Sequence, residues 1–277
     1  MTTLSYADLR RDIAGMLARF LPPEEAVAES WRWMDEGLGR SRSWMLAHGD
    51  EAVPGAEREQ VGQWIRRRRE GEPWSYLIGW APFRERRWKV TPDTLIPRPE
   101  TELVLEAALD VGRRLGVRRA VDVGTGTGIL GICLALETDW AVTATDLSPA
   151  ALAVARANAE VHGARLAFLE GDLLDPVPEP LELVVSNPPY VAEADRPSLQ
   201  RELAFEPAMA LFSPDQGLQH PTRLLTQAKV RGARAVVMEI GAGQGGELCR
   251  RALSLEWSKA MNHQDLAGHD RILIALA

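Results

Sequence analysis

Four residues that follow the run LELVVS, Asn187, Pro188, Pro189 and Tyr190, combine hydrogen-bond acceptors with a stiff backbone. Proline lacks a backbone N–H and has a nearly fixed φ, so the chain must leave a sheet here as a rigid loop. Such a loop can hold the Asn187 side-chain oxygen and the Pro188 carbonyl still, and both accept hydrogen bonds. The pattern indicates a site that grips an N–H donor. The Tyr190 ring could pack against a flat bound group or merely cover the core.

A glycine-rich turn in VDVGTGTGILGICLAL joins a buried strand to an apolar helix. Glycine allows positive φ and close approach of a ligand, and the free N–H groups at a helix start favour a carboxylate or a phosphate. Gly124, Gly126 and Gly128 therefore predict a ligand site in this turn. Gly126, Gly128 and Gly131 also satisfy the spacing of a dinucleotide fingerprint, and a tight turn without a ligand would use glycine too.

Two aspartates follow the next two expected strands. Asp146 ends AVTATD, eighteen residues after Gly128, where a carboxylate can accept two hydrogen bonds from a ribose diol. Asp172 ends LEGD and is placed to meet an adenine amino group. The pair indicates a bound nucleoside without choosing between cofactors. The alternative for Asp146 is a cap for the following helix, although Ser148 could cap it instead.

Strand-like and helix-like segments alternate beyond residue 118, which is typical of a mostly parallel sheet wrapped by helices. The expected strands are residues 119–124, 141–146, 166–170, 181–186, 233–241 and 271–277. Residues 1 to about 80 have apolar residues at helical spacing instead, and Pro22 and Pro23 end the first helix. The alternation in APFRERRWKVT predicts a small hairpin between the two parts.

At 277 residues and 45% hydrophobic, the chain has the length for one large domain or two modest ones. No run approaches the roughly 18 uninterrupted apolar residues of a membrane span. Met1 to Arg11 is too polar for a signal peptide, so we expect a cytoplasmic protein. Cys133 and Cys249 lack metal spacing, and the five histidines form no HxxxH or HExxH pattern. We therefore expect neither a disulfide framework nor a metal site.

The net charge of -7 disfavours a protein that binds bare phosphate backbone, because such binding depends on many lysine and arginine contacts. It does not exclude a local basic face. Four consecutive arginines, Arg66 to Arg69, end the fourth expected helix. They are either a solvated helix end stabilised by the helix dipole or a basic patch for an acidic partner.

The order of these motifs resembles that of class I S-adenosylmethionine methyltransferases, and the prolines after Asn187 argue against a dehydrogenase. The segments EPWSYLIGW, TLIPRPETE, FEPAMALFSPDQGL, MEIGAGQG and DLAGHDRILIA extend the likeness to the protein-(glutamine-N5) methyltransferases of peptide chain release factors, the HemK or PrmC family. The resemblance implies an α/β fold with a seven-stranded, mostly parallel Rossmann-like sheet. It places a helical substrate-docking domain at 1–80, a hairpin linker at 81–98 and the methyltransferase domain at 99–277.

The resemblance also implies which residues form the site. S-adenosyl-L-methionine would be bound by Gly124, Thr125, Gly126, Thr127, Gly128, Asp146, Asp172, Leu173 and Asn187. The catalytic residues would be Asn187, Pro188 and Tyr190. The substrate, the glutamine of the Gly-Gly-Gln loop in class 1 release factors, would be bound by Asn187, Pro188, Pro189, Tyr190, Arg98 and Glu100. Arg98 could instead form an inter-domain salt bridge, and FEP, residues 205 to 207, would close the site from the opposite side.

Two other functions stay open. A nucleic-acid nitrogen methyltransferase could use the same loop on adenine or guanine. The acidic charge and the lack of a separate basic recognition domain argue against stable nucleic-acid binding, although the arginine run argues for it. A non-catalytic cofactor-binding module could use the loop merely to complete its fold.

Overall fold

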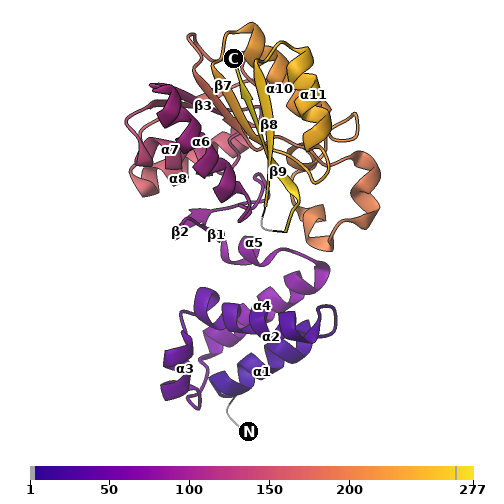
Figure 1. Cartoon of the computed structure of the whole chain (residues 1–277). Helices are drawn as coiled ribbons and strands as arrows, with labels where there is room; N and C mark the ends of the chain where they lie inside the picture. Colours follow the sequence, from indigo (N-terminus) through magenta and orange to yellow (C-terminus); the bar gives the residue numbers. More distant parts are fainter. Residues whose placement is uncertain (1–3, 266) are drawn as a thin grey trace. The chain divides into compact units, whose positions relative to one another are not determined.

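The computed structural model describes residues 4–265 and 267–277. The chain divides into two compact units, Met1–Ile78 and Gly79–Ala277 (Figure 1), so residues 81–98 fall within the second unit. Residues 1–3 of the polar start and Leu266 of the terminal motif lie outside the described residues. Within the described residues, no helix is long and apolar enough to cross a membrane.

Helices build the first unit, as the spacing of its apolar residues predicts. They are α1 Tyr6–Leu17, α2 Pro23–Arg32, the π-helical turn Trp33–Gly37, α3 Arg42–His48, α4 Gly55–Glu70 and α5 Trp74–Ile78. The Ser5 hydroxyl caps α1 by accepting a hydrogen bond from the Asp8 N–H, and the Asp8 carboxylate accepts one from the Ser5 N–H in return. Pro22 and Pro23 open α2, where a missing N–H costs no helical hydrogen bond.

Three tryptophans, Trp33, Trp64 and Trp74, form the centre of this unit. Trp33 and Trp74 stack with ring centroids 4.8 Å apart, and Trp64 meets both of them edge-on. The indole N–H groups of Trp33 and Trp74 donate to Glu29 and Glu36, so the buried rings keep their polar atoms paired. The first unit therefore has an apolar core of its own.

The arginine run at the end of α4 is divided between core and surface. Arg68 is 5% exposed, and its guanidinium donates to the two Glu29 oxygens at 2.7 Å and 3.0 Å. Arg67 pairs with Glu72 and is exposed. Removing one partner of a buried pair leaves an uncompensated charge, so the Arg68–Glu29 pair is part of the structure of the unit. Neither a solvated helix end nor a basic patch describes Arg68.

A seven-stranded sheet with helices on both faces forms the second unit, which confirms the predicted fold class. The strands are β3 Arg119–Val123, β4 Ala141–Asp146, β5 Ala167–Glu170, β6 Leu183–Ser186, β7 Ala235–Glu239, β8 Lys259–Gln264 and β9 Asp270–Leu276. Their order is β5-β4-β3-β6-β7-β9-β8, and β9 runs in the opposite direction to the other six strands. Strand β8 was not predicted, because its sequence KAMNHQ is largely polar and lies at a partly exposed edge of the sheet.

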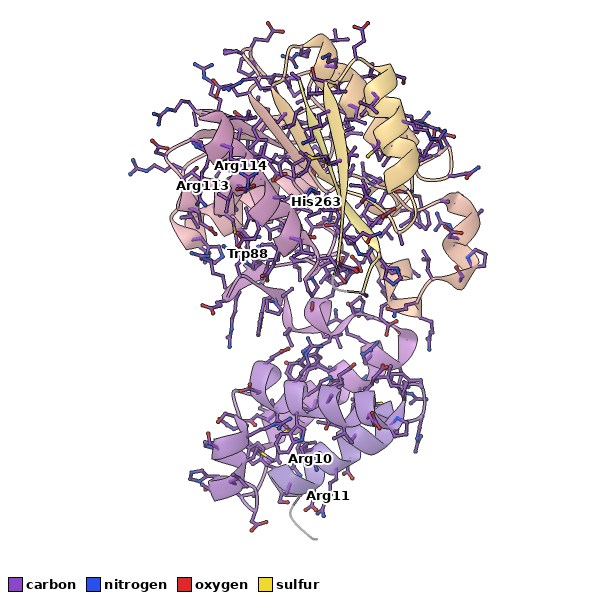
Figure 2. The ribbon with its side chains drawn as sticks, viewed as in Figure 1. Arg10, Arg11, Trp88, Arg113, Arg114 and His263 are labelled. Carbon is purple, nitrogen blue, oxygen red and sulfur yellow. The ribbon has the colours of Figure 1, made fainter. Side chains whose placement is uncertain are left out.

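Two apolar cores lie on the two faces of the sheet, beneath the helices that cover each face in Figure 1. One is covered by α6 Thr101–Leu115, α7 Ile129–Glu137 and α8 Pro149–His162, and the other by α10 Gln219–Val230 and α11 Gly245–Ser254. The central strands are nearly continuous apolar runs because both of their faces are buried. Arg113 and Arg114 lie in the last turn of α6 (Figure 2), where positive charge is favoured by the helix dipole.

The predicted hairpin is present as β1 Trp80–Phe83 and β2 Arg86–Lys89. Its turn residues, Arg84 and Glu85, have φ of 49° and 57°. Such left-handed turns match the twist of the flanking strands but usually contain glycine or asparagine. Here the Arg84 N–H donates to Glu102 and its guanidinium to Glu137, which holds the turn against α6 and α7.

The sheet order reverses at β3, with β4 and β5 on one side and β6 and β7 on the other. In open parallel sheets, ligands bind at such a point, outside the carboxyl ends of the strands. Val123 pairs in register with Ser186, whose hydroxyl donates to the Val123 carbonyl at 2.7 Å. The next residues along the two strands, Gly124 and Asn187, are thus brought to the same edge of the sheet.

Candidate active site

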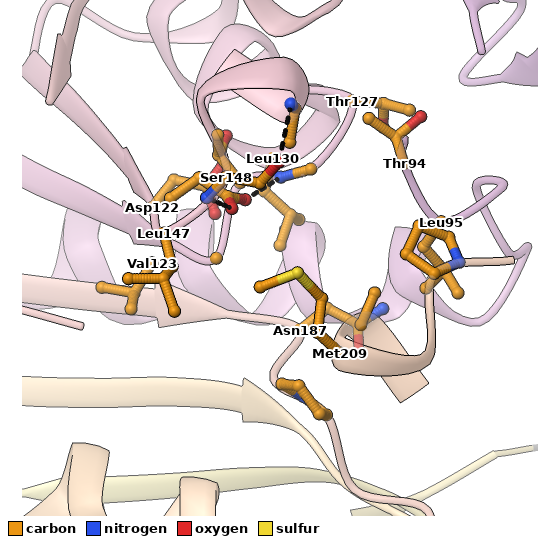
Figure 3. A pocket seen from close by; sticks show the side chains of 18 of the residues that line it. Thr94, Leu95, Asp122, Val123, Thr127, Leu130, Leu147, Ser148, Asn187 and Met209 are labelled. Carbon is orange, nitrogen blue, oxygen red and sulfur yellow. Dashed lines mark hydrogen bonds between the residues drawn. The ribbon is translucent and has the colours of Figure 1, made fainter. Parts of the chain in front are cut away.

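A cavity lies at the carboxyl ends of β3, β4 and β6 (Figure 3), and residues of the segments 93–98 and 207–212 also line it. Of the residues expected at the site, it is lined by Arg98, Gly124, Thr125, Gly126, Thr127, Asp146, Asp172, Leu173, Asn187 and Pro189. The other expected residues are described by the structure but do not line the cavity: Glu100, Gly128, Pro188 and Tyr190. The cavity therefore gathers residues from several distant segments.

Asp122, near the end of β3, is buried with half of its carboxylate unpaired. Its Oδ2 accepts hydrogen bonds from the Thr125 hydroxyl at 2.6 Å and the Gly131 N–H at 2.8 Å. Its Oδ1 is buried and has no hydrogen-bond partner among the described residues. Burial raises the pKa of the Asp122 carboxyl to about 6, although both hydrogen bonds lower it. A buried anionic oxygen without a partner is suited to a cationic group such as an ammonium.

Asp146, at the end of β4, holds the glycine turn in place. Its two oxygens accept hydrogen bonds from the Gly126 N–H and the Ser148 N–H, both at 2.9 Å. Burial raises the pKa of Asp146, and these backbone N–H groups oppose the rise. The side-chain cap of α8 is Ser148, whose hydroxyl accepts from the Ala151 N–H. Each Asp146 oxygen keeps a second lone pair that can serve a ligand.

Asp172 and Leu173 lie in the turn after β5. The Asp172 carboxylate accepts a hydrogen bond from the Arg223 guanidinium of α10 at 2.5 Å. Leu173 has φ of 49°, and its carbonyl accepts from the Thr145 hydroxyl at 2.9 Å. His220 also lines the cavity. Burial and the charge of Arg223 lower the pKa of His220, so the imidazole is neutral at neutral pH.

Asn187, just after β6, is tied to a buried carboxylate through a chain of hydrogen bonds. Its Nδ2 donates to the Thr101 hydroxyl oxygen at 3.3 Å, and the Thr101 hydroxyl donates to Glu239 Oε2 at 2.7 Å. The Tyr190 hydroxyl donates to the other Glu239 oxygen at 2.9 Å. Burial raises the pKa of both Glu239 and Tyr190. The Tyr190 hydroxyl is therefore occupied within the protein.

Packing holds the backbone of the loop at Tyr190. The Gln244 side chain donates to the Tyr190 carbonyl at 2.9 Å and accepts from the Gly241 N–H at 2.8 Å. A Cβ atom at Gly217 would lie 2.0 Å from the Tyr190 carbonyl oxygen, so only glycine fits there. The loop is thus fixed at both ends, by its prolines and by these contacts.

Two groups of polar side chains face each other across the cavity. Figure 3 shows Asp122 and Ser148 on one side and Asn187 with Met209 on the other. We call the first, at the ends of β3 and β4, the carboxylate side. We call the second, Asn187 with the partners behind it, the amide side.

Glu206 joins the two segments that border the cavity. Its side chain is 1% exposed and accepts hydrogen bonds from the Ile96 N–H at 2.9 Å and from the Arg98 guanidinium. Glu206 belongs to FEP, and the next residue, Pro207, lines the cavity. Burial raises the pKa of Glu206, and the Arg98 charge opposes the rise. The Arg98 ion pair lies within the second unit, so it is not the inter-domain salt bridge considered above.

Residues 14–79 match the PrmC N-terminal domain, and residues 101–215 match the methyltransferase small domain. A release factor glutamine methyltransferase from Bordetella pertussis is 42% identical over 241 residues, covering 85% of this chain and 89% of that protein. This chain belongs to the release factor glutamine methyltransferase family. The family member from Deinococcus radiodurans is 37% identical and covers 98% of both chains. The resemblance seen in the motifs is confirmed.

Solved structures of more distant proteins share the methyltransferase fold. The N-terminal domain of human METTL16 in complex with SAH has a TM-score of 0.52 at 15% identity, covering 82% of this chain and 85% of that one. This likeness concerns the fold alone. It agrees with the seven-stranded, mostly parallel sheet.

The sequence of this release factor glutamine methyltransferase assigned no individual role to five polar residues of the site: Thr101, Asp122, Glu206, His220 and Glu239. Glu206 was expected there only as part of FEP, and Asp122 only as the end of the strand before the glycine turn. Thr101 and Glu239 stand inside TLIPRPETE and MEIGAGQG, segments that carried the family resemblance without a role for these side chains. Glu239 at the end of the apolar run AVVM was the clearest signal, because a buried charge needs partners. His220 carried no signal in the sequence.

Proposed function

We propose that this chain transfers a methyl group from S-adenosyl-L-methionine to the side-chain amide nitrogen of the glutamine in the Gly-Gly-Gln loop of class 1 peptide chain release factors. The observation that carries the proposal is the position of Asn187, whose amide lines the cavity opposite Asp122. Membership of the release factor glutamine methyltransferase family supports this reaction. When bound, S-adenosylmethionine supplies a methyl group carried on a positively charged sulfur.

We assign the carboxylate side of the cavity to this cofactor. The unpaired Oδ1 of Asp122 fits the ammonium of the methionine part. The turn Gly124–Gly128, with its two threonines, would border the cofactor, and the first turn of α7 that follows it would offer backbone N–H groups to the cofactor carboxylate. The N–H groups of Thr125, Gly126 and Gly128 already donate within the protein. Asp146 can accept hydrogen bonds from the ribose hydroxyls, and Asp172 with Leu173 would flank the adenine.

Asn187 and Pro188 would activate the substrate nitrogen. A glutamine amide is a poor nucleophile because its lone pair is delocalised into the carbonyl. Asn187 Oδ1 and the Pro188 carbonyl can accept hydrogen bonds from its NH₂ group and so favour the positive charge that develops on nitrogen. The rigid Pro188–Pro189 segment fixes the backbone beside Asn187, which lines the cavity, although Pro188 itself does not line it. Holding the nitrogen in line with the methyl carbon can lower the barrier by up to about 7 to 11 kcal/mol, so no side-chain nucleophile is needed.

The same geometry favours a carboxamide over other acceptors. A group without NH₂ would leave two buried hydrogen-bond acceptors unpaired, at a cost of about 1 to 3 kcal/mol each. The Tyr190 ring can cover the flat amide while its hydroxyl stays with Glu239. Arg98 lines the cavity and Glu100 does not, so of these two Arg98 is the better placed to contact a bound loop.

We assign docking of the release factor to the N-terminal helical domain, at residues 1–80. Support comes from its match to the PrmC N-terminal domain and from the separate apolar core of the first unit. We expect no stable nucleic-acid complex, because the net charge is -7 and Arg68 of the basic run is paired in the core. A release-factor substrate places the protein in the cytoplasm.

Labelled S-adenosylmethionine tests the proposal. The whole protein is incubated with the cofactor and either a release factor or total nucleic acid. We expect label in the release factor alone, with mass spectrometry placing one methyl group on the glutamine of Gly-Gly-Gln. A release factor that carries glutamate in place of this glutamine is the matched control, because it lacks the NH₂ group. Label in nucleic acid alone would instead identify an adenine or guanine methyltransferase.

A further inference from the structure

We infer that Thr101 and Glu239 are positioning residues that determine which way the Asn187 amide faces. Their hydrogen bonds hold Nδ2 of Asn187 against the start of α6 and so turn Oδ1, the acceptor, toward the cavity. The inference rests on the proposed function, since it explains how the acceptor for the substrate NH₂ is kept in place. Neither residue needs to touch the reacting atoms to act in this way.

The order of donors and acceptors fixes the orientation of the amide. The Thr101 hydroxyl has one proton, which it donates to Glu239 at 2.7 Å. Its oxygen can therefore only accept from Asn187, which lies at 3.3 Å. An asparagine amide carries NH₂ on one branch and oxygen on the other, so the atom facing Thr101 must be Nδ2. Asn187 Oδ1 has no hydrogen-bond partner within residues 4–265 and 267–277 and is left for a ligand.

Glu239 fixes the direction of the Thr101 proton, because a Glu239 oxygen is the acceptor of the Thr101 hydroxyl at 2.7 Å. Its two oxygens accept from Thr101 and from Tyr190. Thr101 is 0% and Glu239 1% exposed. Solvent water therefore cannot replace a hydrogen-bond partner that either residue loses. In this buried series of hydrogen bonds, the direction of each bond determines the direction of the next. The last bond of the series orients the Asn187 amide.

An inverted Asn187 amide would present two N–H donors to the cavity. A glutamine bound there would turn its own carbonyl toward Asn187 and its nitrogen away. The substrate would still bind, but the nitrogen would not face the methyl group. Loss of the positioning should therefore lower kcat more than it raises KM.

The pair of variants Thr101→Val and Thr101→Ser tests this role, because valine keeps the side-chain shape without the hydroxyl and serine keeps the hydroxyl. In the whole protein acting on a release factor, Thr101→Val should lower kcat about tenfold to hundredfold with little change in KM. Thr101→Ser should retain most of the activity. In an Asn187→Ala background, Thr101→Val should have no further effect, because Thr101 acts through Asn187. Additive losses would show a merely structural role and overturn the inference.

A second measurement needs no substrate and separates this inference from the proposed function. In protein labelled with ¹⁵N-asparagine, the Asn187 side-chain NH₂ should exchange slowly with solvent in the wild type and in Thr101→Ser, and faster in Thr101→Val. Equal exchange in all three proteins would overturn the positioning role even where the release factor is methylated. Protection that depends on the hydroxyl supports the role, and if no release factor is methylated, only the proposed function fails.

Discussion

The carboxylate side and the amide side of the cavity are built from contacts of different range. Asp122 is bonded by Thr125 and Gly131, three and nine residues away in the chain. Asn187 instead donates to Thr101, which is 86 residues away in the chain, and Thr101 donates to Glu239, which is 138 residues away. The contacts of Asp122 form within one strand–turn–helix segment, whereas those of Asn187 exist only in the folded sheet.

The two sides also differ in how completely their buried carboxylates are paired. Asp122 keeps one buried oxygen without a partner among the described residues, whereas both Glu239 oxygens accept a hydrogen bond. An unpaired buried carboxylate oxygen destabilises the ligand-free protein and strengthens the binding of a cation. A paired network costs little and fixes an orientation. We therefore expect the carboxylate side to control cofactor affinity and the amide side to control the rate of transfer.

Asn187→Ala should have the largest effect and acts on the amide side. Loss of an acceptor for the developing positive charge should lower methyl transfer by about 10² to 10³-fold. Cofactor binding should survive, because the carboxylate side is untouched. Single-turnover rates and calorimetric titration with S-adenosylhomocysteine measure the two effects separately. Unchanged transfer would show that the loop merely completes the fold, as in a non-catalytic cofactor-binding module.

Asp122→Asn should come next and should affect affinity instead. Loss of the buried charge should weaken cofactor binding about tenfold to hundredfold. Asparagine can still accept from Thr125 and Gly131, so the turn should keep its shape. The rate at saturating cofactor should change far less than the affinity. A larger loss in the saturated rate than in affinity would contradict the division between the two sides.

The same variant measures the cost of burying the Asp122 carboxylate. Folding raises this pKa from 3.8 to about 6, so the folded protein binds the proton more tightly than the unfolded chain does. This tighter proton binding stabilises the folded protein fully below about pH 4. The stabilisation is lost as the pH rises through about 6, which lowers the free energy of unfolding by roughly 3 kcal/mol. Ligand-free Asp122→Asn should therefore gain stability relative to the wild type between about pH 4 and pH 7. Urea unfolding of both proteins at about pH 4 and pH 7 checks this. The same stability difference between variant and wild type at the two pH values would contradict it.

Tyr190→Phe should have the smallest effect on transfer. It tests whether the Tyr190 hydroxyl on the amide side serves stability or the transfer itself. The variant keeps the ring and removes one of the two hydrogen bonds to Glu239. Stability should fall by about 1 to 3 kcal/mol, because a buried carboxylate oxygen loses its donor. Transfer should fall only a few-fold, since Thr101 still holds Asn187. Urea unfolding and release-factor methylation measure the two quantities, and a loss as large as that of Asn187→Ala would mean that the hydroxyl acts directly in transfer.

The sequence pattern predicted the central strands and the edge strand β5 but missed β8 at the other edge of the sheet. The strands β3, β4, β6 and β7 are short apolar runs between turns, so their composition identifies them. Strand β8 is largely polar and is at least partly exposed at every position, as a loop would be. The hairpin followed from its alternation, although the positive φ of Arg84 and Glu85 could not be expected from residue types that rarely adopt it.

The sequence by itself determined the glycine turn, the stiff loop after Asn187 and the family, because glycine and proline restrict the backbone wherever they stand. Only the tertiary structure decided how the polar groups are partnered. In the folded protein, Arg68 donates to Glu29 in the core and Arg98 donates to the buried Glu206. The Asn187 amide is oriented by its hydrogen bond to Thr101. Hydrogen bonds act over about 3 Å, so partners 39, 108 and 86 residues apart in the chain are selected only when the helices and the sheet pack together.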